Sequence, residues 1–339
     1  DEGYEDLKTD FGTHTLIGGD VETAPTEDST GSVNKVYCSI CNFVAKEAIT
    51  LPKLTSADYN VSVATKKWDD GKVYDTTVYT LKDTSVGNYS FNVKSEEITQ
   101  YITAGTSYYS IDEWNNLYPN ALASVTGNKL TMTLAEGTTT TVKASDGVSD
   151  LDGTLDLRLY EEVEISGTGV LDITYTAVQD GINAQTFTIN EGATVNLTGV
   201  SKTDKTGIKV TGNLNVNGTL NISHFSIGQV FTKDGGDIVI NDNIGVNGAL
   251  NISDCTYGFY VYGSTKKQVN IDNKGSILVD GVTNAIYLQY STASNKVNAG
   301  MLLKSSGSFE IKNTTADVIS LGEVLLIEGN ITATTGIAG

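Results

Sequence analysis

Six glycines recur through the second half of the chain at intervals of 23 to 32 residues, and each begins a short segment of alternating apolar and polar residues. They are Gly169, Gly192, Gly218, Gly248, Gly275 and Gly307, and the segments read GVLDIT, GATVNL, GTLNIS, GALNIS, GSILVD and GSFEIK. A period of this length with β-type alternation inside each unit is typical of solenoid proteins. The repeat predicts stacked rungs, with glycine at a tight corner where a positive φ angle favours it.

The alternation also predicts which side chains fill the core. In GALNIS, Leu250 and Ile252 fall on one face of a strand, and Asn251 falls on the other. The same phase extends this apolar column to the other units, through Leu171/Ile173, Val195/Leu197, Leu220/Ile222, Ile277/Val279 and Phe309/Ile311.

Two further strands are expected in each rung, one beginning nine residues after the first inward position and one ending before the next glycine. The second strand would turn inward Phe259/Val261, Ile286/Leu288 and Val318. The third would turn inward Phe187/Ile189, Leu214/Val216, Ile238/Ile240 and Val269/Ile271. Three short strands per rung predict a parallel β-helix.

The chain is expected to be all-β and to have three parts: a polar N-terminal arm over 1–33, a β-rich N-terminal domain over 34–145 and the parallel β-helix over 146–339. Residues 1–33 are acidic and polar with little periodicity, which is typical of an extended segment. Within the second part, residues 129–134 and 138–142 give the pattern of a β-hairpin.

The rest of the β-rich domain combines strands with short helices. Residues 59–68 and 73–81 alternate like paired strands. Short helices are expected over 95–102 and 110–117, the second with Ser110 as its N-cap.

The charge balance restricts the partners. Lys and Arg total 22 against 41 Asp and Glu, a formal net charge of −19, which repels nucleic acid and anionic membranes. No run approaches the roughly 20 apolar residues of a membrane-spanning helix, so we expect no membrane insertion. No signal peptide is visible, and Asp1 is expected to be the mature end after one was removed, which predicts an extracellular or cell-surface location.

Residues 146–339 resemble the pectin-lyase-like family of right-handed parallel β-helices. They are most similar to the Gly-, Asn- and Thr-rich versions found in bacterial and archaeal adhesin-like surface proteins. The resemblance rests on the rung pattern and covers a little over half of the chain. It implies the right-handed β-helix fold and, as one option, the cleavage of polysaccharides.

The residues required for that cleavage do not assemble in the sequence. Glycoside hydrolysis needs two carboxylates about 5–10 Å apart, and stacked positions on neighbouring rungs lie about 4.8 Å apart. The outward column of the first strand reads Asp172, Asn196, Asn221, Asn251, Leu278 and Glu310, with no two acids adjacent. The lyases of the family rely on Ca²⁺-binding acids with an Arg or Lys, and the single arginine, Arg158, precedes the first clear rung. We therefore predict that the chain is not an enzyme.

Metal and redox motifs are weak. Cys38 and Cys41 form a CxxC, but a zinc site would need two further ligands and the chain has two histidines. Small apolar strand side chains are the simpler interpretation of these cysteines, with a redox pair as the alternative. No cofactor is predicted. Three acids near one expected turn leave Ca²⁺ open as a ligand, although a solvated turn is the simpler account: Asp234, Asp237 and Asp242.

Eight Asn-x-Ser/Thr sequons occur, at Asn60, Asn88, Asn196, Asn217, Asn221, Asn251, Asn313 and Asn330. They are acceptor sites for glycans in an extracellular eukaryotic or archaeal protein. Chance is the simpler origin in a chain rich in Asn, Ser and Thr.

One strip of aromatic residues is expected on the outer surface. Phe231, Tyr260, Tyr287 and Ile319 lie 12 or 13 residues after their rung glycines, and Tyr262 is next to them. The phase that buries Val261 and Leu288 points Tyr260 and Tyr287 outward. We predict a binding strip of Phe231, Tyr260, Tyr262 and Tyr287 for glycans or for another surface protein. The alternative is an aromatic ladder that strengthens the sheet, or a strip covered by a loop or by the N-terminal unit.

The last rung is expected to lack a helical or charged cap, and such an open rung invites strand addition. Two alternatives follow: the protein continues beyond Gly339, or this end meets a partner. The arm at 1–33 is a candidate for that strand in a second copy, which would build a head-to-tail filament. The main prediction is an extracellular, non-enzymatic structural or adhesive β-helix protein. A self-assembling extracellular filament and a polysaccharide lyase or glycoside hydrolase are the alternatives.

Overall fold

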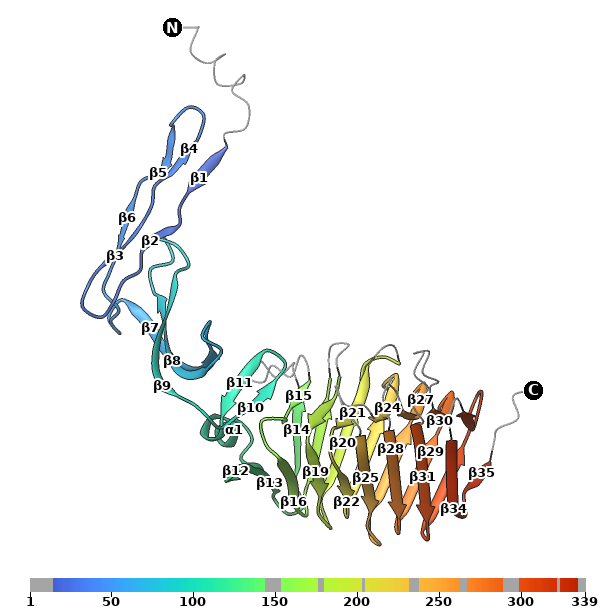
Figure 1. The fold of residues 1–339 in the computed structure, drawn as a ribbon. Helices are drawn as coiled ribbons and strands as arrows, with labels where there is room; N and C mark the ends of the chain where they lie inside the picture. The colour runs from blue at the N-terminus through green and yellow to red at the C-terminus, as the bar shows by residue number, and fades with distance from the viewer. Residues whose placement is uncertain are drawn as a thin grey trace, which may run out of the picture. The chain divides into compact units, whose positions relative to one another are not determined.

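In the computed structural model the chain divides into two compact units, Asp1–Ile98 and Thr99–Gly339 (Figure 1). The structure describes residues 15–143, 154–175, 180–202, 205–231, 238–261, 267–288, 299–321 and 324–334. Almost all of its regular structure is β-strand, which confirms the predicted fold class.

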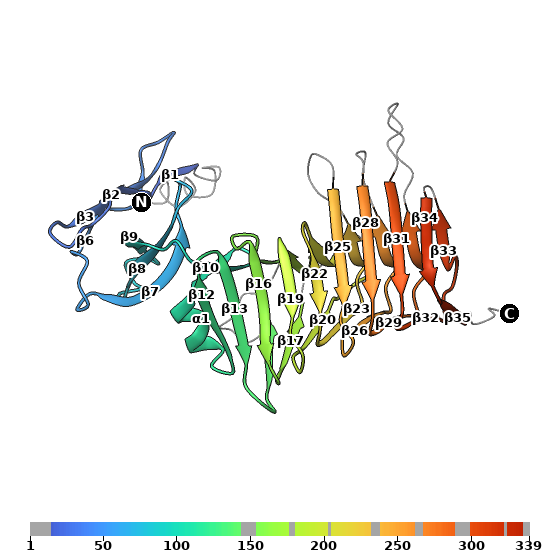
Figure 2. The same cartoon turned by 60° about the horizontal axis from the view of Figure 1, so that its bottom comes forward.

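The second unit is a parallel β-helix of three long sheets, which Figure 2 shows along its length. The first sheet contains the strands that follow the rung glycines: β14 (Thr139–Lys143), β17 (Val170–Thr174), β20 (Thr194–Thr198), β23 (Thr219–Ser223), β26 (Ala249–Ser253), β29 (Ser276–Asp280), β32 (Ser308–Lys312) and β35 (Thr332–Thr334).

The second and third sheets form the other two sides. The second sheet runs β11 (Ser107–Ser110), β10 (Tyr101–Ala104), β15 (Leu155–Asp156), β18 (Ile182–Ala184), β21 (Thr206–Val210), β24 (Ile227–Phe231), β27 (Tyr257–Val261), β30 (Asn284–Leu288) and β33 (Ile319–Leu321). The third sheet runs β12 (Ala121–Thr126), β13 (Lys129–Leu134), β16 (Glu162–Gly167), β19 (Thr186–Ile189), β22 (Leu214–Val216), β25 (Ile238–Ile244), β28 (Lys267–Asn273), β31 (Ala299–Ser305) and β34 (Val324–Gly329).

The predicted inward column of the first sheet is confirmed. Leu220, Leu250 and Ile277 lie opposite one another on consecutive strands, and each is at most 1% exposed. All twelve inward side chains predicted for this sheet belong to one continuous hydrophobic core. The alternation identified this face because a parallel register stacks equivalent residues directly on each other.

The rung glycines are required mainly by close backbone contact. Of the six, Gly192 alone has a positive φ angle, 87°. A Cβ at Gly248 would lie 1.9 Å from the carbonyl oxygen of Val216. The expected positive φ is therefore wrong for five of the six, where the tight approach of the preceding strand excludes a side chain instead.

One further column at the corners does have left-handed backbone. The residue that follows each of three strands of the first sheet has a positive φ, namely His224 (64°), Asp254 (52°) and Asn313 (50°), and Gly281 follows a fourth (65°). His, Asp, Asn and Gly are the residue types that adopt this conformation at low cost.

The solenoid begins earlier than predicted, because residues 99–143 supply the first strands of all three sheets. β13 pairs in parallel with β16, and β14 pairs in parallel with β17. The expected hairpin between these two segments is therefore wrong: β13 pairs antiparallel with β12 instead. Alternation alone does not distinguish a strand that turns back from one that passes into the next sheet.

A helix and two hairpins close this end of the core. α1 (Ile111–Leu117) follows Ser110, whose side chain and that of Glu113 form a capping box, as the predicted N-cap implies. Trp114 is buried in the same core and donates its indole N–H to the carbonyl of Ala121 over 3.0 Å. The helix expected over 95–102 is wrong, since β9 and β10 occupy that segment.

Register also corrects the far end of the second sheet. Ile319, not Val318, lies opposite the buried Ile286, although Val318 also packs against the core as predicted. The turn before β33 therefore contains one residue more than the nine-residue spacing allows.

From residue 15 onward, where the structure describes it, the first unit contains three small antiparallel sheets. Their strands are β1 (Leu16–Gly18), β4 (Val36–Cys38) and β5 (Val44–Lys46); β2 (Val21–Thr23), β3 (Gly31–Val33) and β6 (Ile49–Leu51); β7 (Tyr59–Lys67), β8 (Val73–Leu81) and β9 (Ser90–Glu97). The predicted strand pair at 59–81 is confirmed as β7 and β8. The arm expected over 1–33 is a folded part of this unit from Leu16 onward, because β1, β2 and β3 pair with later strands.

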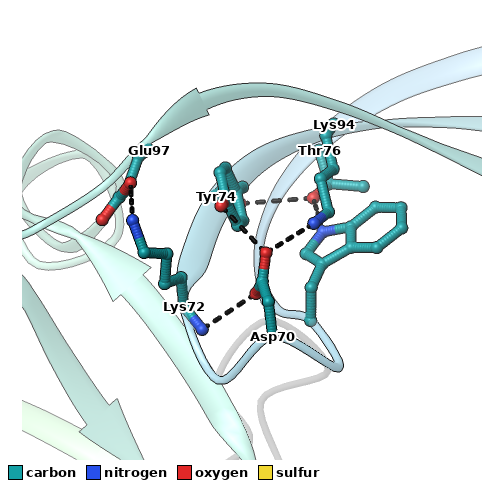
Figure 3. A network of polar contacts seen from close by, with 7 residues as sticks. Asp70, Lys72, Tyr74, Thr76, Lys94 and Glu97 are labelled. Carbon is teal, nitrogen blue, oxygen red and sulfur yellow. Dashed lines mark hydrogen bonds and ion pairs between the residues drawn. The ribbon is translucent and has the colours of Figure 1, made fainter.

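A polar network joins the β7–β8 turn to β9 (Figure 3). The Asp70 carboxylate accepts hydrogen bonds from Nζ of Lys94 over 2.7 Å and from the hydroxyl of Tyr74 over 3.0 Å. Nζ of Lys94 also lies 4.8 Å from the ring centroid of Trp68 and 4.5 Å from that of Tyr74. The hydrogen bond from Lys94 lowers the pKa of Asp70 to about 2, so this carboxylate stays ionised over a wide pH range and links the turn to β8 and β9.

The stacked core predicts the effect of removing one side chain. We expect Leu250→Ala to lower the free energy of unfolding by about 2–5 kcal/mol, because a cavity between two neighbouring rungs does not collapse. Urea unfolding measures this, with Thr219→Ala on the outer face of β23 as the control, expected to change stability by less than about 0.5 kcal/mol. A loss below about 0.5 kcal/mol for Leu250→Ala would contradict the inward phase.

Candidate functional site

Three tyrosines gather on the outer face of the second sheet. Tyr260 on β27 lies opposite Tyr287 on β30, and their rings stack with centroids 5.1 Å apart and an interplanar angle of 18°. Tyr257 packs its ring 5.1 Å from Tyr260 and 5.0 Å from Tyr287. All three are half-buried. We call Tyr257, Tyr260 and Tyr287 the tyrosine cluster.

Two of the four residues predicted for the binding strip belong to this cluster. Phe231 lies opposite Val261 in the backbone register, and Val230 occupies the position next to Tyr260. Tyr262 lies outside the described residues. Ile319, which extended the predicted strip, lies opposite Ile286 instead.

Tyr257 was not predicted, because β27 departs from strict alternation. Gly258 and Phe259 are consecutive and both buried, so Tyr257 and Tyr260 on either side of them both reach the outer face. A Cβ at Gly258 would lie 2.8 Å from Cγ1 of Val279, so the glycine lets the strand press against the first sheet. Gly207, Gly228 and Ala285 hold the same position on β21, β24 and β30, and this series of small residues is the signal that was available in the sequence.

The stacking determines what the cluster offers to a ligand. Tyr260 and Tyr287 each cover one ring face of the other. The next position beyond Tyr287 is Ser320, whose side chain is too short to cover a ring. The side of the Tyr287 ring toward Ser320 is therefore the place where a flat apolar group, such as a sugar ring face, can add to the stack.

A ladder of side-chain amides crosses the outer face of the first sheet. Asn251 donates from Nδ2 to Oδ1 of Asn221 over 2.8 Å, and Asn221 donates to Oδ1 of Asn196 over 2.7 Å. Asn196 donates in turn to the carboxylate of Asp172. This amide ladder borders a shallow groove of about 340 Å³, whose other side is formed by Thr174, Thr198 and Ser223.

The ladder explains three of the eight sequons. Asn196, Asn221 and Asn251 each use the amide nitrogen in a hydrogen bond to the preceding rung. The Ser or Thr two residues later is the next outward position of the same strand. Alternation in a polar β-strand is therefore sufficient to generate these sequons.

The acids of the described strands do not stack directly on one another along the sheets. No two carboxylates lie opposite each other on neighbouring strands in the described register; Asp172 faces Asn196, and Asp272 faces Lys304. Asp242, one of the three acids considered as Ca²⁺ ligands at an exposed turn, is instead buried in the core at 1% exposure. Asp234 and Asp237 lie outside the described residues.

One cluster of titratable side chains occupies an outer corner. Asp254 accepts from Nδ1 of His224 over 2.8 Å and from Nζ of Lys202. These two bonds, that from Lys202 first, lower the pKa of Asp254. The adjacent Cys255 is buried, which raises the pKa of its thiol to about 11. The corner therefore holds an ion-paired carboxylate next to an unreactive thiol, which is no arrangement for nucleophilic catalysis.

The described residues contain no group of three or more His, Cys, Asp or Glu side chains that would hold a metal ion. In the CxxC, Cys38 is buried and Cys41 is exposed. The helix found in the described part of the chain, α1, is seven residues long and too short to cross a membrane.

Comparisons with protein-family models, with curated proteins and with solved structures found no match for this chain. The resemblance to pectin-lyase-like β-helices therefore stays a prediction.

The amide ladder predicts a measurable loss of stability when it is interrupted. Asn221→Leu removes two side-chain hydrogen bonds, and leucine suits the site because Leu278 occupies the same column two rungs later. We expect the free energy of unfolding to fall by about 1–2 kcal/mol. Ser223→Ala, an outward change on the same strand, is the control in urea unfolding. Equal stability of Asn221→Leu and the unmodified protein would contradict a stabilising ladder.

Proposed function

We propose that the chain is a non-enzymatic, adhesive scaffold of an extracellular or cell-surface protein. The observation that carries this proposal is the way in which outward side chains are used. The amide ladder and the tyrosine stack bind side chains of one rung to those of the next. Such ladders stiffen the solenoid along its axis, which is what a stalk or a presenting surface requires.

The arrangement of charges supports a role without catalysis. Hydrolases of glycosidic bonds place two carboxylates on either side of the scissile bond, whereas the described register separates every strand carboxylate from the next by an amide, hydroxyl, apolar or lysine side chain. This supports binding over cleavage as the activity of the outer faces.

The adhesive surface in this proposal is the tyrosine cluster, and its ligand is a neutral glycan. The position beside Ser320 accepts a sugar ring against Tyr287, and the neighbouring Asn284 adds a polar side chain of the same sheet. A net charge of −19 disfavours anionic glycans.

Binding to a panel of neutral and uronate glycans tests the proposal. We expect a neutral glycan to bind without being cleaved, and Tyr287→Ala to weaken that binding about tenfold or more, as loss of an aromatic stacking contact does. Tyr108→Ala is the matched control, since Tyr108 is another half-buried tyrosine of the second sheet that packs against Tyr101, away from the cluster. Cleavage of any glycan, absence of binding to all of them, or equal losses in both variants would contradict the proposal.

A filament subunit is the second candidate, and the last described rung favours it. Ile327 on β34 lies opposite the buried Leu303, in an inward column, yet it is 38% exposed. A further layer of strands from a second copy would cover this position. Negative-stain electron microscopy over a concentration series decides between the two: ordered fibres support the filament, and single particles at every concentration contradict it.

A further inference from the structure

Among the described residues, two polar side chains from different sheets meet in the core of the solenoid at positions that are apolar in neighbouring rungs. In the third sheet, β25 places Asp242 level with Leu214 of β22 and opposite Ile271 of β28, both of which are buried. In the second sheet, Gln229 lies between the buried Ile208 and Phe259. Asp242 and Gln229 are each 1% exposed. We call them the core polar pair.

The pair is joined by hydrogen bonds across the core. Gln229 donates from Nε2 to Oδ2 of Asp242 over 2.5 Å, and the backbone N–H of Leu214 donates to Oδ1 over 3.3 Å. The other amide atom, Oε1 of Gln229, is buried without a hydrogen-bond partner. A protonated Asp242 has an O–H that can donate a hydrogen bond to an amide oxygen such as Oε1 of Gln229, whereas an ionised Asp242 has only acceptor atoms and cannot donate to it.

The pair lies at a step in the solenoid. The third sheet has strands of three residues at β22 and of seven residues at β25, so the sheet widens at this point. Leu214 is the first residue of the short strand β22. Its N–H points toward the longer strand β25, at the place where the backbone hydrogen bonds between the two strands begin. The Asp242 side chain binds this N–H at the step.

No described cation forms an ion pair with Asp242; Lys304 of β31 borders the same surface hollow as Asp242, but its Nζ pairs with Glu328 over 3.3 Å. β22 and β24 carry no titratable side chain, and β27 carries Tyr257 and Tyr260 on its outer face. β28 carries Asp272, whose carboxylate lies outside beside Lys274, and Lys267 at its far end opposite Ile238. The inward residues of the first sheet at these rungs are Leu220, Ile222, Leu250 and Ile252. The segment 232–237, with Lys233, Asp234 and Asp237, lies outside the described residues.

We propose that the core polar pair makes the packing of the neighbouring rungs depend on pH. While Asp242 is protonated, the rungs that contain β22, β24 and β25 stay packed together, and when Asp242 ionises they open locally. We call this site the acid-closed joint. An isolated buried carboxylate is destabilising by several kcal/mol unless the surrounding structure opens to water. Sheets of a solenoid open in local units, so the rungs at this step separate before the rest of the core unfolds.

The pH range follows from the burial of Asp242. Burial raises the pKa of this carboxyl from 3.8 to about 7, against the opposing effect of its hydrogen bonds from Gln229 and Leu214. A group with a raised pKa in the folded state contributes its full stability below its unfolded pKa and loses it as the pH rises to the folded one. The joint is therefore closed at pH 4 and loosens between pH 4 and pH 7.

Hydrogen exchange compared with Asp242→Asn tests the joint in the full chain. Asparagine keeps the shape and one acceptor oxygen but has no charge. At pH 8 we expect the backbone amides of β22 and β25 to exchange about tenfold or more faster in the unmodified protein than in Asp242→Asn, and at pH 4 we expect equal rates. Asp172→Asn, the same change at an outward position, is the control and leaves the difference intact.

Infrared spectroscopy gives a second measurement that does not need the variant to fold. The unmodified protein should show the carbonyl band of a protonated carboxylic acid at pH 6, which disappears as the pH rises past 7. Equal exchange in the unmodified protein and Asp242→Asn at pH 8, or absence of that band at pH 6, would overturn the proposal. Its outcome is independent of glycan binding, because the core polar pair has no part in the tyrosine cluster.

Discussion

The structure of the second unit depends on one constraint, the matched register of parallel strands from rung to rung. Each interior strand is hydrogen-bonded on both edges, so a shift of one residue would turn its apolar side chains outward and break every column at once. The register that stacks Leu220, Leu250 and Ile277 inside also stacks Asn221 on Asn251 outside. The core and the outer ladders therefore stabilise the same alignment, and neither can change without the other.

The part of the fold that depends on simple alternation was predictable from the sequence. The first sheet alternates strictly and begins at glycines, and its register and burial match the prediction. The predictions were wrong at the turns, where the chain passes from one strand to the next. The segment after Leu134 turns into the next sheet and not back along the same one, and the turn before Ile319 is longer by one residue. Turn length and direction are decided by packing against neighbouring rungs, which a single segment does not record.

The candidate sites divide in the same way. Tyr260 and Tyr287 were found because the buried Val261 and Leu288 set the phase of their strands. Tyr257 was hidden by the two consecutive buried residues that follow it. The alternation that turns Ile238 and Ile240 inward also places Asp242 on the inward face, although an acid close to a turn is usually solvated. Only the fold reveals its partner, because Gln229 comes from a different sheet and no local pattern links the two segments.

The amide ladder also gives the solenoid a net side-chain dipole along its axis. Each asparagine donates toward the N-terminal rung, so the positive ends of the amide dipoles all point the same way and end at the negative charge of Asp172. Asn243 and Asn215 repeat this orientation on the third sheet. The aligned side chains thus imitate on two faces of a β-structure what peptide groups do in an α-helix, where an acid at the positive end is favoured. A charged molecule that binds along either of these faces therefore experiences a different electrostatic potential at the two ends of the ladder.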